Sequence, residues 1–104
     1  MHSKFKSGIG VLVVLLFMIS CGEKKESVNV GKVVYTQNCQ LCHGVDGKLG
    51  LNGSKDLTKS ELTLSQRIEI ISNGKNAMTP FRNILSKKEI EAVAGYTLTL
   101  VQQK

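Results

Sequence analysis

The sequence is poor in aromatic residues, with no Trp, 2 Tyr and 3 Phe among its 104 residues. Phe5 and Phe17 belong to an N-terminal segment that is interpreted below as a targeting signal, so the remaining domain keeps only Phe81. A domain this small buries a marginal core unless a disulfide, a metal or a bound cofactor adds to it. The shortage of aromatic side chains therefore predicts a core that is completed by something other than side chains.

No nucleic-acid motif accompanies the positive charge of the chain, so nucleic acid is not expected as a partner. The formal net charge is +6 at pH 7, and Lys4 and Lys6 of the N-terminal segment contribute two of these charges. The basic excess that remains fits docking onto an acidic partner protein. It fits solubility alone equally well.

The chain also lacks an apolar run long enough to cross a membrane. Residues 9–19 are apolar apart from Gly10, but a spanning helix needs about 20 such residues. Lysines before a short apolar run and a small residue after it predict a secretory signal peptide at residues 1–20. The run ends in Met18-Ile19-Ser20-Cys21, which resembles a bacterial lipobox with Met where Leu is usual.

This resemblance implies that Cys21 carries a lipid anchor; the alternative is an ordinary residue near a cleavage site. Lipidation would remove an unpaired thiol from an oxidising compartment. Residues 21–29 are polar and charged, as in a flexible tether, and residues 30–104 would form the domain. We therefore expect a protein exported to the bacterial cell envelope and held at a membrane surface by lipid.

Cysteine is scarce as well, and two of the three form the motif Cys39-Gln40-Leu41-Cys42-His43. C-x-x-C-H is the attachment signature of c-type haem. On a helical turn the two sulfurs project to one side, where each can bond a vinyl group at one edge of the porphyrin. His43 then lies beneath the ring and can ligate the iron. The motif predicts one covalently bound haem c.

The motif has three other interpretations. A thioredoxin-type pair normally follows a strand, and no strand pattern precedes Cys39. A zinc site would need a fourth ligand, and residues 21–104 contain no further His, while their remaining Cys is Cys21. A simple disulfide is the third alternative. Haem attachment is favoured, and export fits it because haem c is attached outside the bacterial cytoplasm.

The second axial ligand follows by elimination. The predicted signal segment contains His2, Met1 and Met18. Because His43 is already assigned as the first ligand, Met78 is the one His or Met that remains. Met78 stands in a stretch rich in turn-forming residues, 73–81, and a loop of this kind can carry a thioether to the open face of the iron. Lys75 is the one nearby substitute, and it would have to lose its proton to bind.

Three helices are predicted, at residues 29–41, 64–72 and 87–102. Gly31, Tyr35 and Cys39 share one face of the first. Capping boxes, Thr63 with Gln66 and Ser86 with Glu89, begin the other two, and Asn73-Gly74 ends the second. The residues expected to face inward are Leu64, Ile68, Ile71, Ile90, Val93, Ala94 and Val101, flanked by Tyr96 and Leu100. Residues 44–62 show no reliable periodicity and are predicted to wrap the haem edge as a loop.

Together these pieces resemble the monohaem class I cytochromes c, particularly the small bacterial type. The resemblance covers residues 30–100 and is carried by Gly31-x-x-x-Tyr35, Cys39-x-x-Cys42-His43-Gly44, Asn73-Gly74-Lys75, Met78-x-Pro80-Phe81 and Leu85-Ser86-x-x-Glu89-Ile90 with Tyr96. It implies an all-α class I cytochrome c fold of three to four helices around one haem, with the first and last helices crossing near Gly31 and Tyr96. It also implies thioethers at Cys39 and Cys42 and axial ligation by His43 and Met78.

The chain departs from this family pattern twice. Thr79 intervenes between Met78 and Pro80, where the family often has Met followed directly by Pro. The family usually has a second Pro whose carbonyl orients the axial His. Because Pro80 is the only Pro here, the loop near residues 52–53 is expected to supply another acceptor for His43.

The predicted function is a single-electron carrier, not an enzyme, in an envelope or respiratory electron-transfer chain. Six-coordinate iron with His and Met ligands leaves no position for a small-molecule substrate, and thioether ligation favours the ferrous state. Redox proteins are the expected partners, with Lys48, Lys55 and Lys75 as candidates for steering an acidic surface. The alternatives are a small haem peroxidase or gas sensor with an open iron position, and a non-haem thiol or metal protein.

Overall fold

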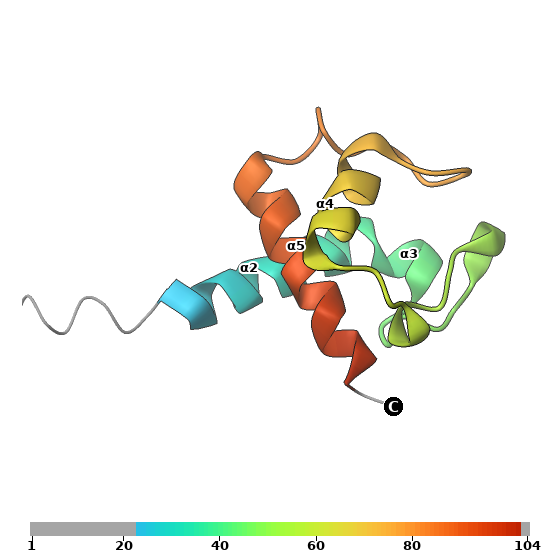
Figure 1. Ribbon diagram of the computed structural model, residues 1–104, viewed down its shortest axis with the longest axis horizontal. Helices are drawn as coiled ribbons and strands as arrows, with labels where there is room; N and C mark the ends of the chain where they lie inside the picture. The colour runs from blue at the N-terminus through green and yellow to red at the C-terminus, as the bar shows by residue number, and fades with distance from the viewer. Residues whose placement is uncertain (1–22, 103–104) are drawn as a thin grey trace, which may run out of the picture.

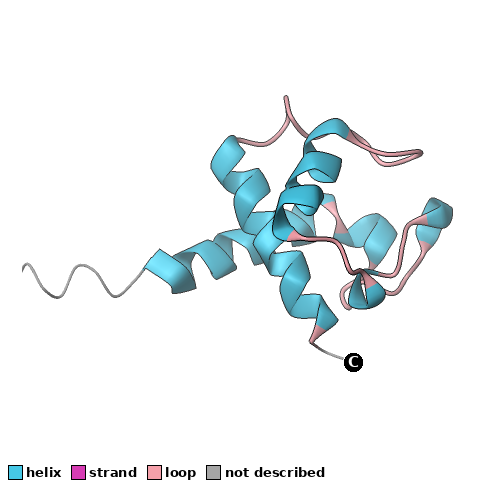
Figure 2. Ribbon diagram, in the orientation of Figure 1, coloured by secondary structure: helices cyan, strands magenta, loops and turns pink. Residues whose placement is uncertain are grey.

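The computed structural model describes residues 23–102, and within that range the chain is helical with no strand (Figure 2). Its α-helices are α2 (Glu23–Asn38), α3 (Gln40–His43), α4 (Leu64–Asn73) and α5 (Lys87–Val101), and two 3-10 helices, η3 (Leu51–Gly53) and η4 (Leu57–Lys59), lie between α3 and α4. The all-α prediction is confirmed. In the described range, no helix combines the length and apolarity that a membrane crossing requires. The predicted signal peptide and Cys21 lie outside the described residues.

Helix α2 differs from the predicted helix at residues 29–41 at both ends. It begins at Glu23, so residues 23–29 of the predicted flexible tether are helical. This extension is rich in Glu and Lys, which lose little rotamer freedom in a helix and need no packing partner. The C-terminal boundary also differs, because α2 ends at Asn38 and a separate turn, α3, carries the end of the cysteine motif.

Both predicted capping boxes are confirmed. Thr63 Oγ1 accepts from Gln66 N at 3.2 Å while Gln66 Oε1 accepts from Thr63 N at 2.9 Å. Ser86 and Glu89 repeat the arrangement at the start of α5, with distances of 3.1 and 2.9 Å. Each box satisfies two backbone N–H groups that a helix start leaves without partners. These local contacts explain why the observed starts of α4 and α5 agree with the sequence pattern.

Helices α2 and α5 cross in Figure 1. Their close approach includes Gly31 of α2. A Cβ added at Gly31 would lie 2.9 Å from Tyr96 Cβ and would also collide with the carbonyl group of Ala92. Only a residue without a side chain permits this approach. One turn further along α2, the ring of Tyr35 packs against that of Tyr96, with centroids 5.2 Å apart and planes tilted by 52°. The predicted crossing near Gly31 and Tyr96 is confirmed.

The core lies between α2, α4 and α5. Its buried apolar members are Val34, Tyr35, Cys39, Ile71, Ile90, Val93, Ala94 and Leu100. Two of the residues predicted to face the core do not do so. Leu100 is fully buried whereas Val101 is only half-buried, because Leu100 follows Val93 by seven residues on one helical face. Leu64 is exposed, and the buried face of α4 runs instead through Arg67 and Ile71.

The segment from Gly44 to Thr63 is more ordered than the predicted loop. Leu49 N donates to the carbonyl of His43 at 3.0 Å, and Leu57 N donates to that of Gly47 at 2.9 Å. Between these bonds the chain reverses through Gly50, Asn52 and Gly53, which all have positive φ. The bonds hold the segment beside the C-terminus of α3, where it closes one side of the site described next.

Candidate haem-binding site

The cysteine motif is held by the junction of α2 and α3. Cys39 N donates to the carbonyl of Tyr35 at 2.8 Å and so completes the last turn of α2. The carbonyl of Cys39 then accepts from Cys42 N at 3.3 Å and from His43 N at 3.0 Å. This tight turn carries both cysteines, and both are free thiols. Burial raises the pKa of Cys39 to about 11, and the neighbouring Cys42 adds to the rise.

Tyr35 ties the motif to the core. Its hydroxyl donates to the carbonyl of Gly44 at 2.6 Å, just after His43, and the ring is 1% exposed. On the other flank, Ser54 Oγ donates to the carbonyl of Cys42 at 2.7 Å. The turn that carries Cys42 and His43 is therefore fixed from both sides before any ligand binds.

The imidazole of His43 is oriented by a backbone carbonyl. His43 Nδ1 lies 3.2 Å from the carbonyl oxygen of Lys55. Because a carbonyl can only accept, Nδ1 must carry the proton, which leaves the lone pair of Nε2 free to bind a metal. Burial lowers the pKa of His43, and the bond to Lys55 opposes that shift. The loop does supply the expected acceptor for His43, two residues beyond Asn52-Gly53.

Met78 approaches the site on the loop between α4 and α5. Gly74 ends α4 with a positive φ of 73°, and Met78 N donates to the carbonyl of Lys75 at 3.0 Å. Phe81 N donates to the carbonyl of Ile71 at 2.9 Å, which ties the far end of the loop back to α4. A Cβ at Gly74 would lie 2.6 Å from the carbonyl oxygen of Met78. The predicted Asn73-Gly74 stop thus also sets the path of the loop that carries Met78.

These side chains meet in one cavity of about 620 Å³. Cys39, Cys42, His43 and Met78 all line it, and so do Tyr35 and Phe81. Its size lies within the range of cofactor sites, about 300–1,000 Å³. Two thiols, an imidazole and a thioether are the donor set that a covalent haem with six-coordinate iron requires. The residues present therefore fit the group that the motif predicts.

The charges around the cavity are mostly positive. The ionised residues among those lining it are the cations Lys55, Lys59, Arg67 and Lys75 and the carboxylate Asp56. Asp56 accepts from Thr58 N at 2.9 Å and from Thr58 Oγ1 at 2.6 Å. These bonds hold the pKa of Asp56 below its ordinary value, the hydroxyl bond contributing most. Such a lining favours an occupant that carries carboxylates of its own.

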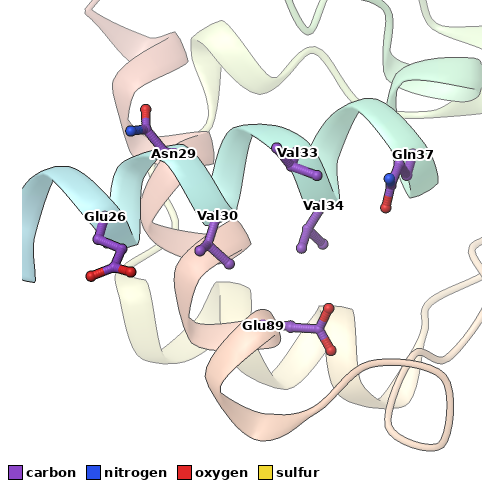
Figure 3. Close-up of a pocket in the computed structure, with 7 residues that line it drawn as sticks. All are labelled: Glu26, Asn29, Val30, Val33, Val34, Gln37 and Glu89. Atoms are coloured by element: carbon purple, nitrogen blue, oxygen red, sulfur yellow. The ribbon is translucent and has the colours of Figure 1, made fainter.

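A second pocket lies between α2 and the start of α5 (Figure 3). It holds about 270 Å³ and is lined by Glu26, Asn29, Val30, Val33, Val34, Gln37 and Glu89. None of these residues is a Cys, His or Met, so this pocket does not compete for the predicted haem. Residues 23–102 contain no group of three or more His, Cys, Asp or Glu placed to hold a metal ion.

Several residues that shape the site were not predicted from the sequence. The carbonyl of Lys55 has no sequence signature, because every residue carries a carbonyl. The buried position of Arg67 was missed because charged residues are usually exposed. The hydrogen bond from the Tyr35 hydroxyl to the carbonyl of Gly44 was not predicted either. Tyr35 itself was placed on the correct face of the first helix. For the acceptor of His43, the one available signal in the sequence was the absence of the second Pro that the family usually has.

Comparison with known proteins finds relatives over most of the described chain. Residues 26–96 match the family described as "Cytochrome C oxidase, cbb3-type, subunit III". Cytochrome c6 of Rippkaea orientalis is 39% identical over 74 residues, which are 65% of this chain and 66% of that protein. A cytochrome c6-like protein of Nostoc sp. is 33% identical over 98 residues, 85% and 86% of the two chains. Cytochrome c6 of Alaria esculenta is 33% identical over 78 residues, 69% and 90%.

No solved structure matches the chain significantly. The matched region nevertheless includes every residue predicted to touch the haem. The chain belongs to the cytochrome c family, as a monohaem class I cytochrome c. It therefore binds one haem c covalently and is an electron-transfer protein, not an enzyme.

Proposed function

We propose that this protein carries single electrons in a bacterial cell envelope, using one haem whose iron is ligated by His43 and Met78. The observation that carries the proposal is the meeting of four donor groups, from the α2–α3 junction and the α4–α5 loop, in one cavity. The Cys39 and Cys42 thiols would each add across a vinyl double bond to form a thioether. The haem supplies a one-electron couple when bound.

The protein's own contribution is a fixed ligand geometry. The carbonyl of Lys55 holds the His43 ring in the tautomer that presents Nε2. The bonds of Tyr35 and Ser54 fix the backbone on either side of that ring. Because each group is already held by protein contacts, little rearrangement is expected when the iron changes oxidation state, which favours fast transfer.

Absorption spectra of the matured protein test the proposal. We expect a low-spin ferric spectrum with a sulfur-to-iron charge-transfer band, and a ferrous protein that does not bind carbon monoxide. A high-spin ferric spectrum with ready binding of cyanide or carbon monoxide would instead assign the protein to the peroxidases or gas sensors. A colourless protein, expressed with haem-maturation machinery, would indicate the thiol or metal alternative.

The cations beside the cavity are proposed to steer an acidic redox partner. Lys48 is exposed on the segment after α3, while Lys55 and Lys75 are exposed and line the cavity itself. Leu41, Val45, Leu49 and Leu51 are exposed on the same stretch of chain and would supply apolar contact area. Positive charge near the point of electron exit raises the encounter rate with an anionic surface.

We expect the rate of electron transfer to an acidic acceptor protein to fall as salt rises, because the Debye length is only about 10 Å at 0.1 M. Replacing Lys55 and Lys75 together with Gln should flatten this dependence. Lys87→Gln with Lys88→Gln removes the same charge at the start of α5 and serves as the control. Stopped-flow rates that do not respond to ionic strength in the wild-type protein would contradict steering.

Attachment to a membrane through lipid on Cys21 remains a proposal from the sequence. The motif at residues 18–21 and the short apolar run before it support it. We expect the wild-type protein to sediment with membranes and to incorporate labelled fatty acid, and Cys21→Ser to lose the label. A Cys21→Ser protein that keeps the label would show that the lipid is attached to another residue.

A further inference from the structure

Arg67 is an unusual member of the cavity lining because it is both charged and buried. Its side chain is 4% exposed, on the first turn of α4, at a position where an amphipathic helix would normally place an apolar residue. The guanidinium stays ionised at any working pH, although burial lowers its pKa. Burying a charge costs free energy unless an opposite charge or several hydrogen bonds compensate it.

The protein contacts of Arg67 are all to neutral acceptors. Nε donates to the carbonyl of Leu62 at 2.9 Å, and Nη2 donates to that of Ser60 at 3.2 Å. Nη1 donates to Thr97 Oγ1 at 3.0 Å, and that hydroxyl in turn donates to the carbonyl of Ala94 at 2.7 Å. These bonds use three of the five N–H groups and clamp the guanidinium plane between the start of α4 and α5. They orient the charge without neutralising it.

The remaining N–H groups, one on each terminal nitrogen, belong to a side chain that lines the haem cavity. The carboxylate that shares this lining, Asp56, is committed to Thr58. A haem, by contrast, carries two propionate carboxylates. Guanidinium groups bind carboxylates through short, charge-assisted hydrogen bonds. The cavity thus presents a fixed cation for an acid that the cofactor itself would bring.

We propose that Arg67 binds a propionate carboxylate of the haem and keeps it ionised. This inference rests on the proposed function, because it assumes a haem in the cavity. Arg67 then has two roles that differ in kind. Its three bonds to neutral groups join Ser60, Leu62 and Thr97, and its charge sets the electrostatic potential at the iron. A buried positive charge beside the cofactor stabilises the ferrous state relative to the ferric state.

The test measures reduction potentials of the matured full-length protein from pH 5 to 9. Arg67→Gln removes the charge and Arg67→Lys keeps it. Arg82 is the only other Arg in the chain; it is exposed, bonds Asn73 Oδ1 at 2.6 Å and does not line the cavity. Arg82→Gln is therefore the matched control. The other charged or titratable groups facing the cavity, Lys55, Asp56, Lys59, Lys75, His43 and Tyr35, are unchanged in all variants.

At pH 7 we expect Arg67→Gln to lower the equilibrium constant for reduction about tenfold, which corresponds to ~59 mV for one electron. Arg82→Gln should change it less than about twofold, since an exposed charge is screened. In Arg67→Gln the potential should also fall with rising pH between 5 and 8 as the propionate titrates, whereas the wild-type potential stays nearly flat. Equal shifts in Arg67→Gln and Arg82→Gln, or a loss in Arg67→Lys as large as in Arg67→Gln, would overturn the inference.

Resonance Raman spectra provide a second readout if Arg67→Gln fails to mature. The propionate bending band of Arg67→Lys should move from its wild-type position, and that of Arg82→Gln should not. An unmoved band in Arg67→Lys would mean that Arg67 only joins α4 to α5. Failure of the proposed function is recognised separately, because the wild-type protein itself would then lack a His/Met haem spectrum.

Discussion

Replacing Met78 with Ala is expected to open one axial face of the iron. The ferric protein should lose its sulfur-to-iron charge-transfer band and the ferrous protein should begin to bind carbon monoxide. The reduction potential should fall by on the order of 100 mV, a modest part of the ~0.8 V that axial ligands span, because thioether ligation favours the ferrous state. Absorption spectroscopy with and without carbon monoxide, followed by redox titration, measures all three effects.

Lys75→Ala is the control for this experiment. Lys75 is on the same loop, and its carbonyl accepts from Met78 N, but its side chain is exposed. The backbone contact survives the substitution, so Lys75→Ala should keep the band and exclude carbon monoxide. The opposite pattern, with the band intact in Met78→Ala and the ferric spectrum altered in Lys75→Ala, would show that Lys75 is the ligand.

Cys39→Ala is expected to leave the haem attached through Cys42 alone. The reduced pyridine complex should absorb at longer wavelength than that of the wild-type protein, because one vinyl group stays conjugated with the ring. Stability should also fall. Cys39 belongs to the buried core cluster, so loss of its side-chain packing and of one covalent link both favour unfolding. Denaturant titration followed at the haem absorbance measures this loss.

Two further substitutions complete that experiment. Cys42→Ala should give the same spectral change with a smaller loss of stability, because Cys42 is only half-buried. Cys21→Ser should leave the linkage of the haem unchanged. A Cys39→Ala protein with a wild-type pyridine spectrum would contradict the assignment of Cys39 as a thioether residue.

The starts of α4 and α5 could be predicted because the contacts that determine them are local. Thr63 and Gln66, like Ser86 and Glu89, are three residues apart and satisfy each other within one turn. The start of α2 was placed too late because its first residues are polar. A helix can continue into such a sequence on intrinsic propensity alone, without an apolar stripe to mark it.

The inward faces were harder to predict than the helices. On α4 the pattern suggested Leu64, Ile68 and Ile71, but the structure buries Arg67 with Ile71 and exposes Leu64. The hydrogen-bond acceptors that make this possible come from Ser60, Leu62 and Thr97, and Thr97 lies 30 residues away in the chain. No local sequence pattern predicts that a buried guanidinium will have these hydrogen-bond acceptors.

The sequence by itself determined the chemistry of this protein. The C-x-x-C-H motif selects a covalent haem, and Met78 is the proposed second axial ligand because hardly any other donor remains in the chain. The tertiary structure alone decided how that chemistry is held. It brings the carbonyl of Lys55 to His43 and the charge of Arg67 into the cavity, through contacts that span 12 and 30 residues. A backbone carbonyl is the same at every position, so only the path of the folded chain can select the one that orients a ligand.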